Sequence, residues 1–196
     1  VGELDLVFGL ENLQGLADDA EFPLVSANLT DEEGAHPFPG HRIVERGGAK
    51  VAFIGLTKQK PRISRYYSKR GVKLEDPRRA YVREVGELPE DVDLVVLLSN
   101  LGIDSTRKLV EGLRKDDKRV DAAVVSNSNR RTRRPVWAAG VPLVEPASRG
   151  KYYGRLDVLL GTDGEIQFSN AAESPVDAFQ DYVSGWSSYA NARSER

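Results

Sequence analysis

Two short apolar runs, each ending in a polar loop, constrain the fold of this chain more than any other feature. They are Val92-Asp-Leu-Val-Val-Leu-Leu-Ser-Asn100 and Val120-Asp-Ala-Ala-Val-Val-Ser-Asn127-Ser-Asn129. Both have the length and the branched apolar content of buried strands. Residues 104–115 lie between them and are expected to form a helix capped by Asp104 or Ser105. This alternation of strand and helix predicts an α/β fold.

The rest of the chain continues the alternation. Asp76 and Pro77 are suited to the N-cap and first position of a helix. Leu10, Leu13 and Leu16 have the spacing of one apolar helix face. The expected helices span residues 10–20, 76–87 and 175–192. The expected strands span residues 22–29 and 141–145, with hairpins at 42–46/50–56 and 152–160/165–170.

The composition excludes several classes of function. Hydrophobic residues make up 40% and charged residues 30% of the chain, which is typical of a globular protein. The net charge of −2 is too small to favour nucleic acid or an anionic membrane surface. The absence of cysteine excludes disulfides, thiolate zinc sites and cysteine nucleophiles within this chain. No apolar run is long enough to span a bilayer.

Five segments, in this order, resemble the calcineurin-like metallophosphoesterase domain of the 5'-nucleotidase and UDP-sugar hydrolase family. They are Phe22-Pro-Leu-Val-Ser-Ala-Asn-Leu29, Lys50-Val-Ala-Phe-Ile-Gly-Leu-Thr57, Asp93-Leu-Val-Val-Leu-Leu-Ser-Asn-Leu-Gly102, Val120-Asp-Ala-Ala-Val-Val-Ser-Asn-Ser-Asn129 and Ala147-Ser-Arg-Gly-Lys-Tyr-Tyr-Gly-Arg-Leu-Asp157. The resemblance implies a layered α/β/β/α sandwich that lacks its N-terminal strands. It assigns residues 1–174 to this incomplete domain and residues 175–196 to a C-terminal helix and tail.

The resemblance also implies a site for two divalent metal ions, but this chain departs from its ligand pattern. Two of the family's motifs would lie upstream of Val1. The Gly-Asn-His-Glu motif falls on Gly2-Glu3-Leu4-Asp5, so Glu3 replaces a bridging Asn and Leu4 replaces the His that protonates the leaving group. The remaining three ligand histidines are replaced by Asn100, Asn127 and Asn129.

A carboxamide binds zinc, manganese or iron only through a weakly basic oxygen, so we expect no metal and no other cofactor here. The favoured interpretation is that the asparagines cap strand ends and bond to loop backbone. One alternative is an oxygen-rich pocket for calcium, formed by Glu3, Asp5 and the three asparagines. His36 and His41 match no metal-ligand spacing and are expected to be surface residues.

Two further groups of residues are candidates for binding. Arg149 and Arg130 are possible anion-binding residues in basic loops. Phe179, Val183 and Trp186 have helical spacing and are a plausible contact with a partner.

The sequence therefore favours a pseudoenzyme, a structural module that binds another protein chain or an adjoining domain. One alternative is a metal-dependent phosphohydrolase, a nucleotidase completed by an upstream segment or by another chain. A second is a relic that binds a nucleotide or phosphate without hydrolysing it. By resemblance alone, the location is expected to be extracytoplasmic, either periplasmic or secreted.

Overall fold

The computed structural model of the chain describes residues 1–58, 69, 71–128, 130, 132–146, 152–161 and 165–175. The contacts divide the chain into two compact units. The first unit comprises Val1–Ser128 and Trp137–Leu143, and the second comprises Asn129–Val136 and Val144–Arg196.

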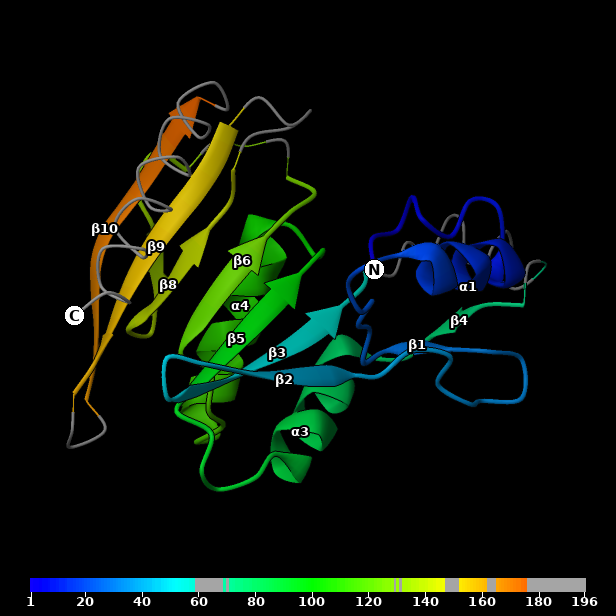
Figure 1. The fold of residues 1–196 in the computed structure, drawn as a ribbon, viewed down its shortest axis with the longest axis horizontal. Coiled ribbons are helices and arrows are strands. Elements are labelled where there is room, and N and C mark those ends of the chain that lie inside the picture. Colours follow the sequence, from blue (N-terminus) through cyan, green and yellow to red (C-terminus); the bar gives the residue numbers. More distant parts are fainter. Residues whose placement is uncertain are drawn as a thin grey trace, which may run out of the picture. The chain divides into compact units, whose positions relative to one another are not determined.

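A six-stranded sheet forms the centre of the first unit (Figure 1). Its strands lie in the order β2 (His41–Arg46), β3 (Ala49–Leu56), β5 (Leu94–Ser99), β6 (Ala122–Val125), β8 (Val141–Val144) and β7 (Val136–Ala138). The hairpin of β2 and β3 turns at Gly47 and Gly48, both with positive φ, as such tight turns require. Because β3, β5 and β6 are parallel, their carboxyl ends share one edge of the sheet, where the candidate site lies.

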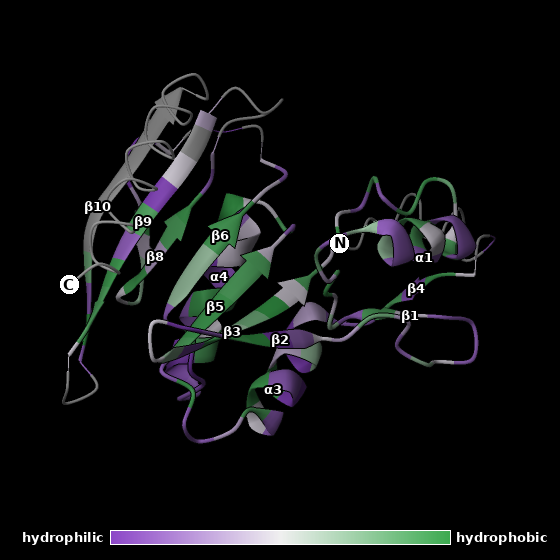
Figure 2. Cartoon of the chain, viewed as in Figure 1, coloured by the Kyte–Doolittle hydropathy of each residue, from purple (hydrophilic) through white to green (hydrophobic). Residues whose placement is uncertain are grey.

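Two helices, α3 (Pro77–Glu87) and α4 (Ile103–Lys115), connect the parallel strands and cover one face of the sheet (Figure 1). Alternate strand residues face these helices and are almost completely buried. They are Ala52, Ile54, Leu56, Val95, Leu97, Ala123 and Val125. Figure 2 shows the matching hydropathy, with β3, β5 and β6 largely apolar. Burial of this apolar surface is the main stabilising contribution in the unit.

A smaller apolar cluster packs α1 (Leu10–Asp19) against the antiparallel pair of β1 (Leu29–Thr30) and β4 (Lys73–Leu74). The buried members of this cluster are Leu6, Leu13, Leu29, Phe38 and Val72. The helix has the predicted bounds to within one residue. However, Leu16, which the spacing assigned to the apolar face, is 58% exposed.

In the second unit, β9 (Tyr152–Leu160) and β10 (Ile166–Pro175) form the predicted antiparallel hairpin. The turn is closed by the N–H of Gly161, which donates to the carbonyl of Glu165 at 2.8 Å. β10 is longer than predicted and contains an irregularity between Ser169 and Ala172. The C-terminal helix expected after Pro175 lies outside the described residues.

The strand expected at residues 22–29 is wrong over most of its length, because only its last residue, Leu29, joins a ladder. Ser26 and Ala27 are nevertheless buried, and their N–H groups donate to the carbonyls of Pro39 and Gly55. A Cβ on Gly55 would lie 2.5 Å from the carbonyl oxygen of Val25. The segment therefore crosses β3 at a glycine instead of pairing along a strand.

The predicted cap of α4 is also wrong. The helix begins at Ile103, and its N-cap is Gly102 with φ of 83°, which makes no side-chain capping bond. The hydroxyl of Ser128, from the loop after β6, accepts the N–H of Ile103 instead. A partner distant in the sequence thus satisfies a helix end that Asp104 or Ser105 was expected to cap.

Candidate functional site

The candidate site lies where β5 and β6 end beside the N-terminal segment. Residues 2–9 form successive tight turns, in which the N–H groups of Asp5, Val7 and Gly9 each donate to the carbonyl three residues earlier. The N–H of Gly2 also donates to the Asp5 carboxylate at 2.7 Å. These turns hold the backbone of Glu3 against the end of β5.

Asn100 connects three segments through its carboxamide and its backbone. Its Oδ1 accepts the N–H of Glu3 at 3.0 Å, and its Nδ2 donates to the Ser126 hydroxyl at 3.0 Å. Its own N–H donates to the carbonyl of Leu56 at 2.8 Å. Each end of the half-buried carboxamide therefore has a partner within the protein.

Asn127 completes this group from the loop after β6. It has φ of 77°, in the left-handed region that asparagine tolerates better than most residues. Its Nδ2 donates to the backbone carbonyl of Asn100 at 3.1 Å. We call the group of Glu3, Asn100, Ser126 and Asn127 the Asn100 junction. Its hydrogen bonds to loop backbone agree with the favoured interpretation of the asparagines.

The two remaining predicted positions of the N-terminal motif differ strongly in exposure. Glu3 is 5% exposed, whereas Leu4 is 74% exposed. An exposed leucine can neither donate a proton nor bind a metal ion. The structure thus brings Glu3, Asn100 and Asn127 together and leaves the side chain of Leu4 in solvent.

The other predicted site residues are not part of this geometry. Asn129, Arg149, Phe179, Val183 and Trp186 lie outside the described residues. Arg130 is exposed and belongs to the second unit. Their roles therefore stay predictions.

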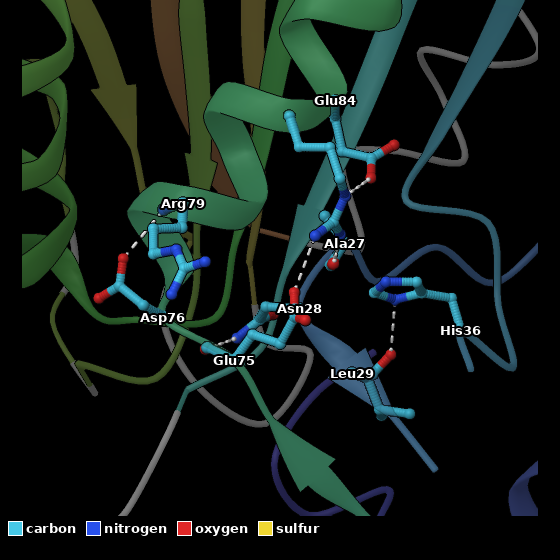
Figure 3. A network of polar contacts seen from close by, with 9 residues as sticks. Ala27, Asn28, Leu29, His36, Glu75, Asp76, Arg79 and Glu84 are labelled. Carbon is cyan, nitrogen blue, oxygen red and sulfur yellow. Dashed lines mark hydrogen bonds and ion pairs between the residues drawn. The ribbon is translucent and has the colours of Figure 1, made fainter. Parts of the chain in front are cut away.

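A second polar group, centred on Asn28, was not predicted from the sequence. Asn28 is 0% exposed, and its Oδ1 accepts the N–H of Thr57 at 2.8 Å. Its Nδ2 donates to the carbonyl of Thr57 at 2.9 Å and, as Figure 3 shows, to that of Glu75 at 3.3 Å. The hydroxyl of Thr57 also bonds to that of Ser26 at 2.9 Å. We call Ser26, Asn28, Thr57 and the Glu75 carbonyl the Asn28 knot.

Charged residues of α3 adjoin the Asn28 knot. Arg83 donates to the Glu75 carboxylate at 2.8 Å, to the Glu84 carboxylate at 3.2 Å and to the carbonyl of Ala27 at 2.6 Å. The hydrogen bond to Glu75 raises the pKa of Arg83 most, followed by smaller contributions from the same two carboxylates. This pairing fixes the position of the guanidinium and stabilises Glu84, which is 7% exposed.

Neither histidine is free. His41 Nδ1 lies 2.9 Å from the buried carboxylate of Glu84, and His36 Nδ1 lies 3.1 Å from the carbonyl of Leu29 (Figure 3). The expectation of two surface histidines is correct for His36, which is exposed, and wrong for His41, which is half-buried. No local pattern indicated the pair of His41 and Glu84, because these residues meet only when α3 packs on β3, the strand paired with β2.

The described residues of this region do not by themselves fit a two-metal centre. Such a centre needs several imidazole or carboxylate ligands around one point. Within the described ranges, no three histidine, aspartate or glutamate side chains lie close enough together to hold a metal ion. At the Asn100 junction, the carboxamide of Asn100 is already hydrogen-bonded at both ends.

The architecture is a metallophosphoesterase-like fold, with 5'-nucleotidases among its structural neighbours. The structure superposes on calcineurin-like phosphoesterase YfkN of Bacillus subtilis with a TM-score of 0.69 and 23% identity, covering 88% of this chain and 61% of YfkN. NAD nucleotidase NadN of Haemophilus influenzae gives 0.72 and 18%, covering 89% and 34% of the two chains. A 5'-nucleotidase precursor of Thermus thermophilus gives 0.68 and 24%, covering 89% and 38%. The predicted fold class is thereby confirmed.

The amino-acid sequence is also similar to that of a curated protein. It is 28% identical over 153 residues to YunD of Bacillus subtilis (strain 168), an uncharacterised metallophosphoesterase. This match covers 76% of the chain and 31% of YunD, so the chain spans about a third of that relative's length. No protein-family model matches the chain.

Proposed function

We propose that this chain is a catalytically degenerate metallophosphoesterase-like domain that acts as a structural or partner-binding module. The observation that carries the proposal is the Asn100 junction. In it, the carboxamide that follows β5 bonds to the Glu3 backbone on one side and to Ser126 on the other. Among the described residues, the side chains at this edge link loops to one another, and none of them is an imidazole.

The physical argument concerns what a hydrolytic site would need at this position. A metal ion that activates water requires ligands whose lone pairs are available, and a leaving group requires a proton donor. The Asn100 carboxamide oxygen is weakly basic and already accepts one N–H, and the Leu4 side chain has no exchangeable proton. Both departures reduce catalysis, whereas hydrogen bonds between loops favour a rigid, inert scaffold.

The partner in this proposal is another protein chain or an adjoining domain. The low net charge of −2 argues against nucleic acid. The proposed contact surface is the apolar helix face predicted by the spacing of Phe179, Val183 and Trp186. Within the described ranges, no helix is both long and apolar enough to cross a membrane. We also propose an extracytoplasmic location, which is supported by the family resemblance and by the description of one structural neighbour as a precursor.

The test is a measurement of metal content and phosphoesterase activity on the purified protein. After dialysis against manganese and zinc, we expect far less than one metal ion per chain by mass spectrometry. We also expect no hydrolysis of p-nitrophenyl phosphate or of nucleoside monophosphates above a buffer control. YfkN, measured in parallel, shows whether the dialysis loads metal into a protein of this fold.

One or two tightly held metal ions per chain, with turnover, would overturn the proposal. That result would instead support a metal-dependent phosphohydrolase completed by an upstream segment or by another chain. Asn100→Leu would then test whether Asn100 is one of the metal ligands, because it replaces a potential oxygen ligand by an apolar side chain of similar size. Loss of metal in this variant, with the native fold retained by circular dichroism, would place a ligand at the Asn100 junction.

A further inference from the structure

A pocket on the helical side of the sheet lies between the first turns of α3 and α4. Its volume is about 310 Å³. Lys58, which lies just after the carboxyl end of β3, is one of its lining residues. Pro77, Leu101 and Leu109 form its apolar wall, and Lys58, Arg78 and Ser105 supply its polar groups. We call it the α3–α4 pocket.

The charged groups that line the α3–α4 pocket are two cationic side chains, Lys58 and Arg78, and one carboxylate, Asp76. Lys58 is half-buried, and no carboxylate among the described residues pairs with it. One nitrogen of Arg78 pairs with Asp116, which leaves its other N–H groups available. The carboxylate of the lining, Asp76, is the N-cap of α3, and its Oδ1 accepts the N–H of Arg79 at 2.9 Å.

An ammonium group that is partly removed from water favours an anionic partner, because such a partner replaces the lost hydration. A guanidinium and an ammonium in the lining of one pocket can bind several oxygens of a phosphate group, and the Ser105 hydroxyl can donate to another. Together with Pro77, Leu101 and Leu109, these groups give the pocket the mixed polar and apolar lining that small-molecule sites have, at the lower end of their usual size.

We propose that the α3–α4 pocket binds a phosphomonoester whose organic group is small and apolar. Lys58 and Arg78 contact the phosphate oxygens, and Leu101 and Leu109 contact the organic group. Binding here requires no metal ion and none of the residues of the Asn100 junction. The proposal therefore stands or falls independently of the proposed function, and adds ligand binding to a domain proposed to lack catalysis.

Phenyl phosphate is the probe, and binding is measured by calorimetry and by shifts of the backbone amide resonances of Ser105 and Leu109. We expect saturable binding at millimolar concentration or below. Lys58→Met is expected to weaken it about tenfold or more, the effect of losing a charge-assisted hydrogen bond. Arg79→Met is the matched control. Arg79 follows Arg78 on α3 and carries the same charge as Lys58, but its side chain lines a different pocket.

Two comparison ligands separate the parts of the proposal. Inorganic phosphate lacks the ring and is expected to bind more weakly, and benzoate carries a single charge and is expected to do the same. Equal binding of either one would overturn the assignment of a phosphomonoester with an apolar group. Melting curves of Lys58→Met and of a second variant, Lys58→Gln, show whether the fold is retained.

The proposal is overturned if phenyl phosphate does not saturate at millimolar concentration. It is also overturned if Arg79→Met weakens binding as much as the folded Lys58 variants do, because the effect would then be one of general surface charge.

Discussion

Asn28 and Asn100 both connect loops around the parallel strands, but they do so in different surroundings. Asn28 is 0% exposed and makes its three hydrogen bonds to backbone groups of Thr57 and Glu75. Asn100 is half-buried and shares its carboxamide between one backbone N–H and one side-chain hydroxyl. If Asn100 is removed, water can take its place as the hydrogen-bond partner of Glu3 and Ser126. If Asn28 is removed, the buried groups of Thr57 and Glu75 are left without a hydrogen-bond partner.

This difference separates a position that maintains the fold from one where function can change. A fully buried amide that satisfies three backbone groups is costly to replace by any other side chain. A half-buried amide at the sheet edge can change with a modest loss of stability. If the metal-ligand positions were lost in this chain, the Asn100 junction is where the fold tolerates such a loss.

The largest effect is expected for Asn28→Ala, which leaves the N–H and the carbonyl of Thr57 buried without a partner. We expect a decrease of about 3 kcal/mol in the free energy of unfolding, measured by urea denaturation. Asn12→Ala, at an exposed position of α1, is the control and should change stability by less than about 0.5 kcal/mol. A similar small change for Asn28→Ala would mean that the knot does not hold the two segments together.

Tyr81 provides a second test of the cost of removing one partner of a buried hydrogen bond. Its OH donates to the carbonyl of Arg119 at 2.8 Å. Tyr81→Phe is expected to lower stability by about 1.5 kcal/mol near neutral pH. Burial raises the pKa of Tyr81 above its ordinary value of 10.0. The tyrosine therefore stabilises the fold below about pH 10, and this contribution is lost as the pH rises further.

The pH profile gives that prediction its check. Above about pH 10, the unfolded chain gains stability by ionising the tyrosine, which the phenylalanine variant cannot do. The difference in stability between the two proteins should therefore shrink to nothing by about pH 11. A constant difference from neutral to alkaline pH would contradict the burial argument.

A smaller effect is expected for Asn100→Ala, about 1 kcal/mol, because water can reach the groups that it leaves. A double-mutant cycle with Ser126→Ala should give a coupling energy of about 0.5 kcal/mol, as expected for one partly exposed hydrogen bond. If Asn100→Ala destabilised the protein as much as Asn28→Ala, the distinction between the junction and the knot would fail.

The smallest effect is expected for Asn127→Gly, within about 0.5 kcal/mol of the parent, because glycine adopts the positive φ of this position more easily than asparagine. This gain offsets the lost bond to the carbonyl of Asn100. Asn127→Val is the contrast, and the strain of a β-branched residue at positive φ should cost about 2 kcal/mol. Equal melting temperatures for the two variants would show that the loop relaxes.

Local patterns in the sequence were sufficient for most of the helices and strands near the sheet. The turn at Gly47 and Gly48 predicted the hairpin of β2 and β3, and Asp76 with Pro77 predicted the start of α3. The apolar run between Val92 and Asn100 predicted β5, which spans Leu94–Ser99. Each signal acts within a few residues, because hydrogen bonds of turns and caps join near neighbours in the chain.

The sequence alone did not reveal contacts between distant segments. The pairing of β1 with β4, the contact of His41 with Glu84, and the capping of α4 by Ser128 each join residues far apart in the chain. Asn100 and Asn127 were predicted to be loop asparagines, whereas Asn28 was assigned to an expected strand. Only packing of the strands decided which is fully buried and which is half-buried, because burial depends on every segment that covers a residue, and no local pattern contains that information.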